Sequence, residues 1–343
     1  MTFTSLPPRP TITRFLGGLA TSLLLATVPL AASAQAQEEK KPAAAPTGIN
    51  YRLVNKTGKF TDDQCFWSLD NGQNWHSFAK ESVVPCPRGN GRMYFYLGTP
   101  PKNFDDHEAY WDFIEYAANN QTWNGNTTQV DAFCIPITIE MGDKKVGIEE
   151  SRKMLFEKFT KEAPEAFKGC VLGGDKWIVS PHIVGFKADG PNGKYFDAYI
   201  DEVWANYAEE KKTPSGKWTG KVTNGALTFT PVEGGGKPLT CSRKPTTQEV
   251  LLGEGILASN PQFCAAINRH VLADPADWRN ADAFYKAEPS NWYSKFLHEH
   301  SIDRKAYGFC YDDASEQAAY FSGKGKELVV TVYWDTPPKG EKK

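Results

Sequence analysis

Apolar and polar residues alternate with a period of two near both ends of the chain. Residues 49–54 and 328–334 show this alternation, residues 93–97 form a short aromatic run, and residues 306–311 are also expected to form a strand. Successive side chains of a strand point to opposite faces, so this pattern predicts strands with one buried face. Segments 65–69 and 74–78 flank Asp70-Asn71-Gly72, a sequence typical of a hairpin turn.

Two longer segments before residue 147 also read as strands. Residues 110–117 and 128–141 are rich in apolar and aromatic residues, and a polar, asparagine-rich loop joins them. We therefore expect residues 49–147 to form an antiparallel β structure.

The pattern changes to a helical period after residue 147. Apolar residues recur three and four positions apart, which predicts helices with one buried stripe. The predicted helices lie at 149–167, 195–212, 246–257, 261–272 and 292–300, with short strands at 177–179 and 226–229.

These elements predict an α+β fold with two domains. A β-sandwich or barrel would be built from residues 49–147 and 306–343, and a mixed α/β domain of residues 148–305 would be inserted into it. Two domains that meet in this way leave a cleft, which is a usual place for a ligand.

The N-terminal 36 residues have the order of features found in a secretory signal peptide. Arg9 and Arg14 precede an apolar stretch that ends in small residues near Ala36. A membrane anchor is the alternative, but Gly17, Gly18 and Pro29 interrupt the stretch. We expect residues 1–36 to be removed, residues 37–48 to act as a linker, and the protein to be secreted, with no attachment to a membrane after cleavage.

The composition narrows the possible partners. The net charge is −2 and no basic patch is evident, which argues against a nucleic-acid partner. Aromatic residues make up 13% of the chain, which suits sugar-stacking surfaces and β-sandwich cores equally well. The histidines of Leu297-His298-Glu299-His300 are two positions apart and would face different sides of a helix, so we expect no metal and no cofactor. We also expect a monomer.

Seven cysteines are present in a chain that we expect to be exported. Exported thiols usually pair, and an odd count leaves one over, so we predict up to three disulfides. Cys134 lies in an apolar segment where a thiol can serve as a small buried side chain, and we nominate it as the unpaired cysteine.

Two acidic residues interrupt the predicted strands on either side of the asparagine-rich loop. If the hairpin closes symmetrically about Trp123, Glu115 lies directly opposite Asp131, with Cβ atoms about 5 Å apart. Glycoside hydrolysis needs two carboxyl groups that flank the scissile bond, one protonated and one ionised. Acids on surface strands are common, however, so the pair alone is weak evidence for catalysis.

Several motifs make the chain resemble glycoside hydrolase family 64. The motif Asn-Thr-Thr-Gln-Val-Asp-Ala-Phe at residues 126–133, with an acid sixteen positions before its aspartate, resembles the laminaripentaose-producing β-1,3-glucanases of that family. Further similar segments occur in order along the chain, at 195–204, 244–250, 264–269, 291–298 and 307–313. The family belongs to the thaumatin-like superfamily, and the segment at 307–313 also resembles the Asp-Asp strand end of thaumatin-like proteins.

The resemblance implies a fold, an activity and a set of site residues. It implies a thaumatin-like β-domain beside a mixed α/β domain, an open groove between them, and hydrolysis of β-1,3-glucan with inversion at the anomeric carbon. Glu115 matches the general acid and Asp131 matches the general base. Residues placed in the groove by the resemblance are Asn119, Trp123, Thr128, Asp312 and Asp313. The sequence departs from the family pattern in the loop before Asp131, which is richer in asparagine and glycine, and this departure bears on the match of Trp123, which the loop can shift by one position.

Two other functions compete with catalysis. Thaumatin-like proteins also include non-catalytic modules that bind glucans, and export by itself is compatible with a structural role in the cell envelope. The presence of both Glu115 and Asp131 at the family spacing favours the enzyme.

Overall fold

The computed structural model describes residues 46–99 and 110–335. The predicted signal peptide lies outside the described residues. Residues 46–48, which we expected in the linker, already belong to the first strand, β1 (Pro46–Lys56). The described residues belong to one compact unit, and the division into domains at residues 147 and 306 stays a prediction.

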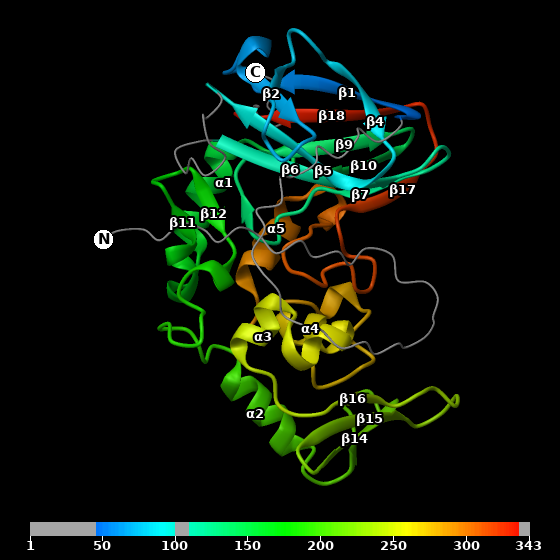
Figure 1. The fold of residues 1–343 in the computed structure, drawn as a ribbon. Helices are drawn as coiled ribbons and strands as arrows, with labels where there is room; N and C mark the ends of the chain where they lie inside the picture. Colours follow the sequence, from blue (N-terminus) through cyan, green and yellow to red (C-terminus); the bar gives the residue numbers. More distant parts are fainter. Residues whose placement is uncertain (1–45, 100–109, 336–343) are drawn as a thin grey trace, which may run out of the picture. The chain divides into compact units, whose positions relative to one another are not determined.

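Strands from both ends of the chain form two large sheets. Five strands lie in the order β10 (Lys144–Gly147), β9 (Ile137–Met141), β18 (Glu327–Tyr333), β1 and β4 (Val83–Pro87). Six lie in the order β17 (Tyr320–Gly323), β7 (Trp123–Asn126), β6 (Tyr110–Ala118), β5 (Gly89–Leu97), β2 (Cys65–Ser68) and β3 (His76–Ser77). Figure 1 shows the blue β1 beside the red β18, and the two strands pair in parallel.

The two sheets share one hydrophobic core. Tyr51 of β1, Phe95 of β5 and Val330 of β18 are buried in the same cluster. β1 alternates between buried and exposed positions from Pro46 to Leu53, and β18 alternates at its start, as the sequence pattern predicted, whereas residues 93–97 of β5 are all buried. The predicted hairpin at Asp70-Asn71-Gly72 is also present, with Trp67 opposite His76 and positive φ at Asn71 and Gly72.

The middle of the chain contains helices and two smaller sheets around a second core. The helices are α1 (Arg152–Glu162), α2 (Asp197–Asn206), α3 (Thr247–Leu252), α4 (Pro261–Asn268) and α5 (Trp292–His300). The three-stranded sheet has the order β11 (Val171–Leu172), β12 (Trp177–Val179) and β8 (Ala132–Phe133). The four-stranded sheet has the order β13 (Lys211–Lys212), β14 (Trp218–Thr223), β15 (Ala226–Pro231) and β16 (Leu239–Cys241). Short 3-10 helices are η1 (Asp62–Gln64), η2 (Glu165–Cys170), η3 (Pro181–Ile183), η4 (Gly255–Ser259), η5 (Ala281–Ala283) and η6 (Ile302–Arg304).

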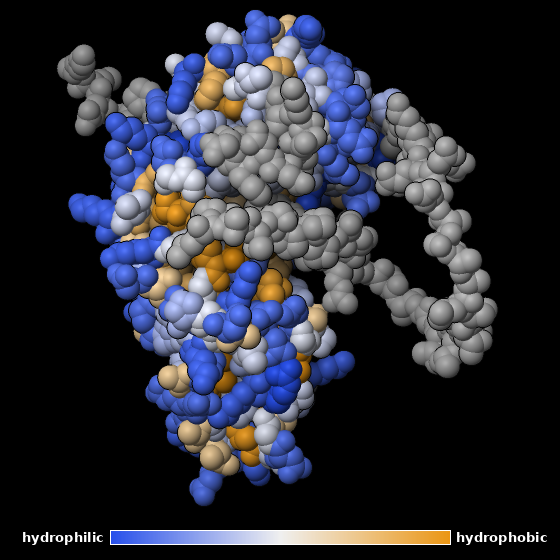
Figure 2. Space-filling view, turned by 60° about the vertical axis from the view of Figure 1, so that its left-hand side comes forward, coloured by the Kyte–Doolittle hydropathy of each residue, from blue (hydrophilic) through white to orange (hydrophobic). Residues whose placement is uncertain are grey.

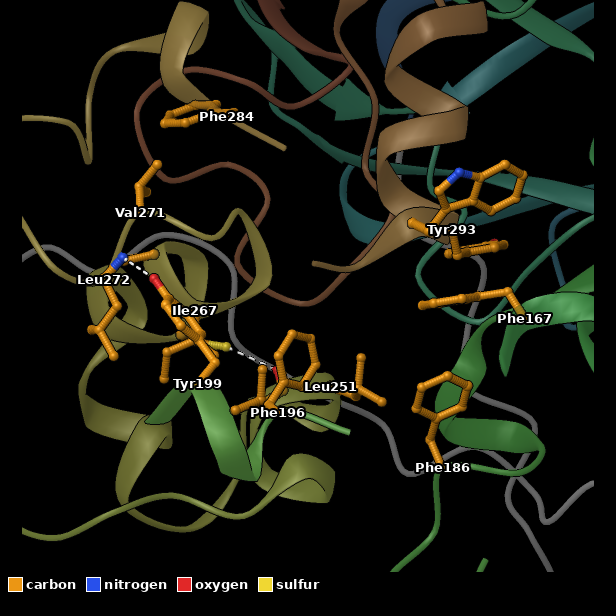
Figure 3. Close-up of a cluster of buried hydrophobic side chains, with 14 of the residues drawn as sticks. Phe167, Phe186, Phe196, Tyr199, Leu251, Ile267, Val271, Leu272, Phe284 and Tyr293 are labelled. Carbon is orange, nitrogen blue, oxygen red and sulfur yellow. Dashed lines mark hydrogen bonds between the residues drawn. The ribbon is translucent and has the colours of Figure 1, made fainter. Parts of the chain in front are cut away.

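Aromatic residues fill much of this second core. Figure 3 shows Phe167, Phe186 and Tyr293 close to one another, with Phe196, Tyr199 and Ile267 further along the same cluster. The hydroxyl of Tyr199 accepts a hydrogen bond from the backbone N–H of Leu272 at 2.8 Å. Figure 2 shows hydrophobic residues on one face of the molecule only as separate small patches between hydrophilic ones.

In the part of the chain that the structure describes, one predicted strand is absent, and the strand predicted at 128–141 is divided into β8 and β9. Residues 306–311 form no strand, because the backbone N–H of Gly308 and the side chains around it bond to Asp312 inside a local turn. Residues 128–131 also lie outside any strand, because β7 ends at Asn126 and the chain leaves the six-stranded sheet there.

All seven cysteines are free thiols in the described residues, so the expected disulfides are absent from the structure. Cys134 is fully buried and unpaired, as nominated, but so are five others, and Cys310 is half-buried. Within the described ranges, no helix is long and apolar enough to span a membrane.

Candidate active site

The register of the β6–β7 hairpin differs from the predicted one. The pairing runs from Ala118 opposite Trp123 to Glu115 opposite Asn126. The turn is therefore the four residues 119–122, which is tighter than a loop centred on Trp123. The expected direct opposition of Glu115 and Asp131 is wrong, and Asn126 takes the place opposite Glu115.

Glu115 lies between two polar neighbours on adjacent strands. On β5 the residue opposite is Arg92, whose Nε and Nη2 donate to Glu115 Oε1 at 3.0 and 2.9 Å. On β7, Asn126 Nδ2 donates to Glu115 Oε2 at 3.5 Å. The Glu115 side chain keeps 21% of its surface exposed. The two oxygens therefore differ: Oε1 is held in an ion pair and Oε2 faces an amide.

Asp131 lies beside a different sheet from Glu115, the three-stranded sheet that contains β8. It immediately precedes β8, where Ala132 pairs with Val179 of β12. The backbone N–H of Ser180 donates to the Asp131 carbonyl oxygen at 2.8 Å. His182 Nε2 lies 3.5 Å from Asp131 Oδ1, and the Asp131 side chain is 30% exposed. Asp131 is thus an accessible carboxylate on a fixed backbone.

The segment that connects Asn126 with Asp131 is unusually polar for its burial. Asn126 Oδ1, Thr127 Oγ1 and Gln129 Oε1 are buried without a hydrogen-bond partner among the residues described. Most buried polar atoms in proteins are hydrogen-bonded, and exceptions often mark functional segments. This cluster distinguishes the stretch between the two carboxylates from the other loops.

Trp123 and Thr128, two of the three loop residues that the resemblance placed in the groove, are too deeply buried to contact a ligand. Trp123 is 0% exposed, and its Nε1 donates to the Tyr51 hydroxyl at 3.2 Å inside the sandwich core. It cannot stack on a sugar, because strand alternation turns its ring inward. Thr128 is 5% exposed and accepts a hydrogen bond from the Val130 N–H.

Asn119 is exposed and has a local role. Its Oδ1 accepts hydrogen bonds from the backbone N–H groups of Gln121 and Thr122, at 2.8 and 2.9 Å. The side chain therefore shapes the β6–β7 turn, in the manner of asparagine in tight turns.

Asp312 is a buried structural residue rather than a groove residue. It receives bonds from Arg269 Nη2 at 2.9 Å, from Ser294 Oγ at 2.9 Å and from the N–H of Gly308 at 2.9 Å, and His298 Nε2 lies 3.0 Å away. Burial by itself would raise its pKa, but the charges and hydrogen bonds of His298 and Arg269 outweigh burial and lower the pKa below its ordinary value. The fully buried position excludes direct contact with a polymer.

Asp313 and Tyr307 connect this turn with Glu115. Asp313 is exposed, and partial desolvation followed by the charge of Asp312 raises its pKa. Tyr307 is buried, and its pKa is raised first by burial and then by the negative charges of Asp313 and Glu115. The Tyr307 carbonyl accepts from the Gln129 N–H at 2.9 Å. One buried tyrosine is therefore close to Glu115, to Asp313 and to the segment that leads to Asp131.

A pocket elsewhere does not include the carboxylates. It has a volume of about 520 Å³ and is lined by residues such as Tyr110, Arg152 and Trp334, but by neither Glu115 nor Asp131. Among the described residues, no group of three His, Cys, Asp or Glu side chains could hold a metal ion.

Sequence reasoning missed Arg92, Asn126, Tyr307 and His182. Arg92 and Asn126 are found only from the strand register, which the sequence does not reveal. Tyr307 falls in one of the motifs that carry the family resemblance, but the electrostatic influence of Glu115 on it comes from a residue far away in the sequence. His182 is an isolated histidine 51 positions after Asp131, and nothing local distinguishes it.

Comparison with known families decides the identity of the chain. Residues 100–332, more than half of the sequence, match the β-1,3-glucanase family, glycoside hydrolase family 64. The chain belongs to this family. The matched region contains both Glu115 and Asp131.

Solved structures of family 64 members have a similar fold. A β-1,3-glucanase domain from Clostridium beijerinckii is 27% identical, with a TM-score of 0.72, over 83% of this chain and 98% of that one. A laminaripentaose-producing β-1,3-glucanase from Paenibacillus barengoltzii, complexed with laminarihexaose, is 28% identical, with a TM-score of 0.66, over 85% and 76% of the two chains. The α+β class is therefore that of the family.

A curated relative is longer than this chain. It is a glucan endo-1,3-β-glucosidase from Cellulosimicrobium cellulans, 24% identical over an alignment of 279 residues that covers 67% of this chain. The chain spans about half the length of that relative.

Proposed function

We propose that this family 64 protein is a glycoside hydrolase that cleaves β-1,3-glucan. The observation that carries the proposal is the family match over residues 100–332, which includes two partly exposed carboxylates, those of Glu115 and Asp131. The relative solved with laminarihexaose supports a β-1,3-linked glucan as the ligand class.

The proposed mechanism is inversion with Glu115 as general acid and Asp131 as general base. An inverting enzyme activates water with one carboxylate while the other carboxyl protonates the leaving oxygen. Because Glu115 Oε1 already accepts two hydrogen bonds from Arg92, we assign the proton of the protonated carboxyl to Oε2, the oxygen that faces Asn126, and this proton passes to the glycosidic oxygen as its bond to the anomeric carbon breaks. Asp131, held by its backbone contact with Ser180, then accepts the proton of water.

Further parts of the proposal concern the surroundings of the site. We propose a thaumatin-like arrangement of the β structure, an open groove beside Glu115 and Asp131, an exported and monomeric protein, and no cofactor. Of the groove residues that the resemblance implied, Asp313 and Asn119 have the exposure that contact with a glucan requires. Trp123, Thr128 and Asp312 support the site from inside the fold.

The test uses the purified protein with laminarin, with products sized over time and the first-formed anomer read by NMR. We expect α-configured reducing ends. Glu115→Gln and Asp131→Asn should each lower kcat by several orders of magnitude while glucan binding persists, because each removes one proton-transfer step. Activity of Asp131→Asn close to that of the unmodified protein would refute the assigned base.

Glu327→Gln is a matched control. Glu327 is also a strand glutamate in an ion pair with an arginine, since Arg52 Nε donates to it at 2.8 Å on an exposed surface. We expect this variant to keep full activity. Tight glucan binding without any product would instead favour a non-catalytic glucan-binding protein.

A further inference from the structure

We propose that His182, oriented by Ser180, is a positioning residue for Asp131. The proposal rests on the proposed function, because it assumes that Asp131 acts as the base. It assigns to His182 the task of fixing the Asp131 carboxylate in one rotamer, so that the oxygen that takes the proton of water is aimed at the substrate.

Backbone pairing alone places Asp131, Ser180 and His182 near one another. The β8–β12 ladder places Val179 opposite Ala132, and the Ser180 N–H continues it with a bond of 2.8 Å to the Asp131 carbonyl. Ser180 then precedes η3 (Pro181–Ile183), whose proline fixes the direction of the turn. His182 is therefore presented from a short, rigid segment attached to the same ladder as Asp131.

The side chains form a chain of contacts from the interior to the carboxylate. Ser180 Oγ lies 2.8 Å from His182 Nδ1, and His182 Nε2 lies 3.5 Å from Asp131 Oδ1. Exposure rises along this chain, from 2% for Ser180 to 13% for the His182 side chain and 30% for the Asp131 side chain. Ser180 and His182 therefore lie between the protein interior and the more exposed carboxylate of Asp131.

The chemistry of the partners fixes the tautomer of a neutral His182. An ionised carboxylate can only accept hydrogen bonds, so the ring proton belongs on Nε2, which faces Asp131. Nδ1 is then an acceptor, and the Ser180 hydroxyl, which can rotate, donates to it. The serine therefore turns the donor edge of the ring towards Asp131.

A serine, a histidine and an aspartate in contact also occur in acyl-transfer enzymes. In those enzymes the serine oxygen attacks the substrate and must be reachable. Ser180 is 2% exposed and lies at the buried end of the chain of contacts. This geometry points to orientation of Asp131 and not to a nucleophilic serine.

The experiment compares His182→Phe, His182→Gln and Ser180→Ala in the full-length protein, with kcat and KM on laminarin as the readouts. We expect His182→Phe to lower kcat roughly 10- to 100-fold, as a misplaced catalytic group does, with KM changed less than about 3-fold. A glutamine amide nitrogen can reach the position of Nε2 and donate to Asp131, so His182→Gln should recover at least part of kcat. Ser180→Ala should give a smaller loss, because the ring remains but its tautomer and angle are no longer fixed.

His76→Phe is the control for loss of a histidine beside an acid. His76 Nδ1 lies 3.3 Å from Glu81 in a half-exposed pair, and we expect unchanged kcat and KM. Thermal unfolding and laminarin binding are measured for every variant. If His182→Phe does not fold, His182→Gln and Ser180→Ala decide the question by the same comparison of kcat with KM.

Including Asp131→Asn in the series separates failure of the positioning role of His182 from failure of the role of Asp131 as the base. If Asp131→Asn is inactive and the folded His182 and Ser180 variants have the kcat of the unmodified protein, the positioning role is wrong and the proposed base stands. If Asp131→Asn is fully active, the assigned base is wrong, and the positioning role is overturned with it. Equal losses in His182→Phe and His182→Gln, accompanied by an equal loss of thermal stability, would also overturn the proposal, since they would reflect packing alone.

Discussion

At the scale of single residues, burial separates the side chains that a ligand could reach from those that can only support the fold. Trp123 and Asp312 have the residue types of a sugar-binding groove, and both were assigned to one from sequence resemblance. The structure buries them completely, the first in the sandwich core and the second among Arg269, His298 and Ser294. Residue type suggested binding, but only the fold shows which side of a strand or turn a residue faces.

Substitution of Trp123 should therefore affect stability. Trp123→Ala removes a fully buried indole and its hydrogen bond to Tyr51, and we expect the free energy of unfolding to fall by about 3–5 kcal/mol. Urea unfolding measures this loss. Laminarin affinity per folded molecule should stay unchanged, and a selective loss of affinity at normal stability would contradict the buried role.

At the scale of elements, alternation and helical periods predicted most strands and helices, while the positions of the turns decided the site. β18 and α5 were predicted nearly to the residue, because a strongly periodic segment leaves few alternatives. The register of β6–β7 could not be predicted, since both a four-residue turn and a longer loop fit the same polar stretch. The strand expected at 306–311 is absent because the Asp312 carboxylate accepts a hydrogen bond from the backbone N–H of Gly308, four positions earlier, within a turn.

The register of that hairpin can be tested through Gly125. A Cβ atom at this position would lie 2.3 Å from the Glu115 carbonyl oxygen and 2.4 Å from the Trp123 ring. Gly125→Ala should therefore push β7 away from β6, lower the free energy of unfolding by at least about 1–3 kcal/mol, and reduce kcat by moving Asn126 relative to Glu115. Thermal unfolding and laminarin kinetics measure the two effects.

Gly169→Ala serves as the control for that substitution. A Cβ atom there meets nothing within 4 Å, and its φ is not in the left-handed region. We expect wild-type stability and activity. If Gly125→Ala behaved like Gly169→Ala, the pairing of Glu115 with Asn126 would be wrong.

At the scale of the whole molecule, the state of the thiols tests the structure against the expectation from export. Seven free thiols are present, and only Cys310 is more than slightly exposed. Burial raises the pKa of Cys65, Cys134 and Cys170 to about 12, which slows their reaction as thiolates. A thiol reagent should therefore label at most about one cysteine quickly in the native protein and seven in denaturant. A count of five or fewer in denaturant, restored to seven by a reductant, would show that disulfides form.

Buried carboxylates should also make the whole fold sensitive to acid. Glu249 accepts hydrogen bonds from Arg243 and from the Thr246 N–H at the start of α3. The bond from Arg243 is the largest influence on Glu249 and, with the Thr246 bond, overcomes burial, lowering its pKa from 4.5 to about 2. The pKa of Asp312 is lowered as well, since His298 and Arg269 outweigh the effect of its burial. A group whose pKa is lower in the folded state stabilises the fold above its unfolded pKa, and that contribution is lost as the pH falls through the folded pKa.

The free energy of unfolding should accordingly fall as the pH is lowered from about 5 towards 2. The variant Glu249→Gln tests how much of this fall is due to Glu249. The raised pKa of Asp313 acts in the opposite direction, because protonation relieves its unfavourable contact with Asp312. Glu249→Gln should be less stable at pH 7 by about 1–2 kcal/mol, a value reduced by the exposure of Arg243, and should lose less stability on acidification. Urea unfolding of both proteins at several pH values measures the difference between their slopes. Parallel curves between pH 5 and pH 2 would mean that Glu249 is not responsible. The acid sensitivity would then be assigned to Asp312, whose protonation weakens its bonds to Arg269, Ser294 and the Gly308 N–H.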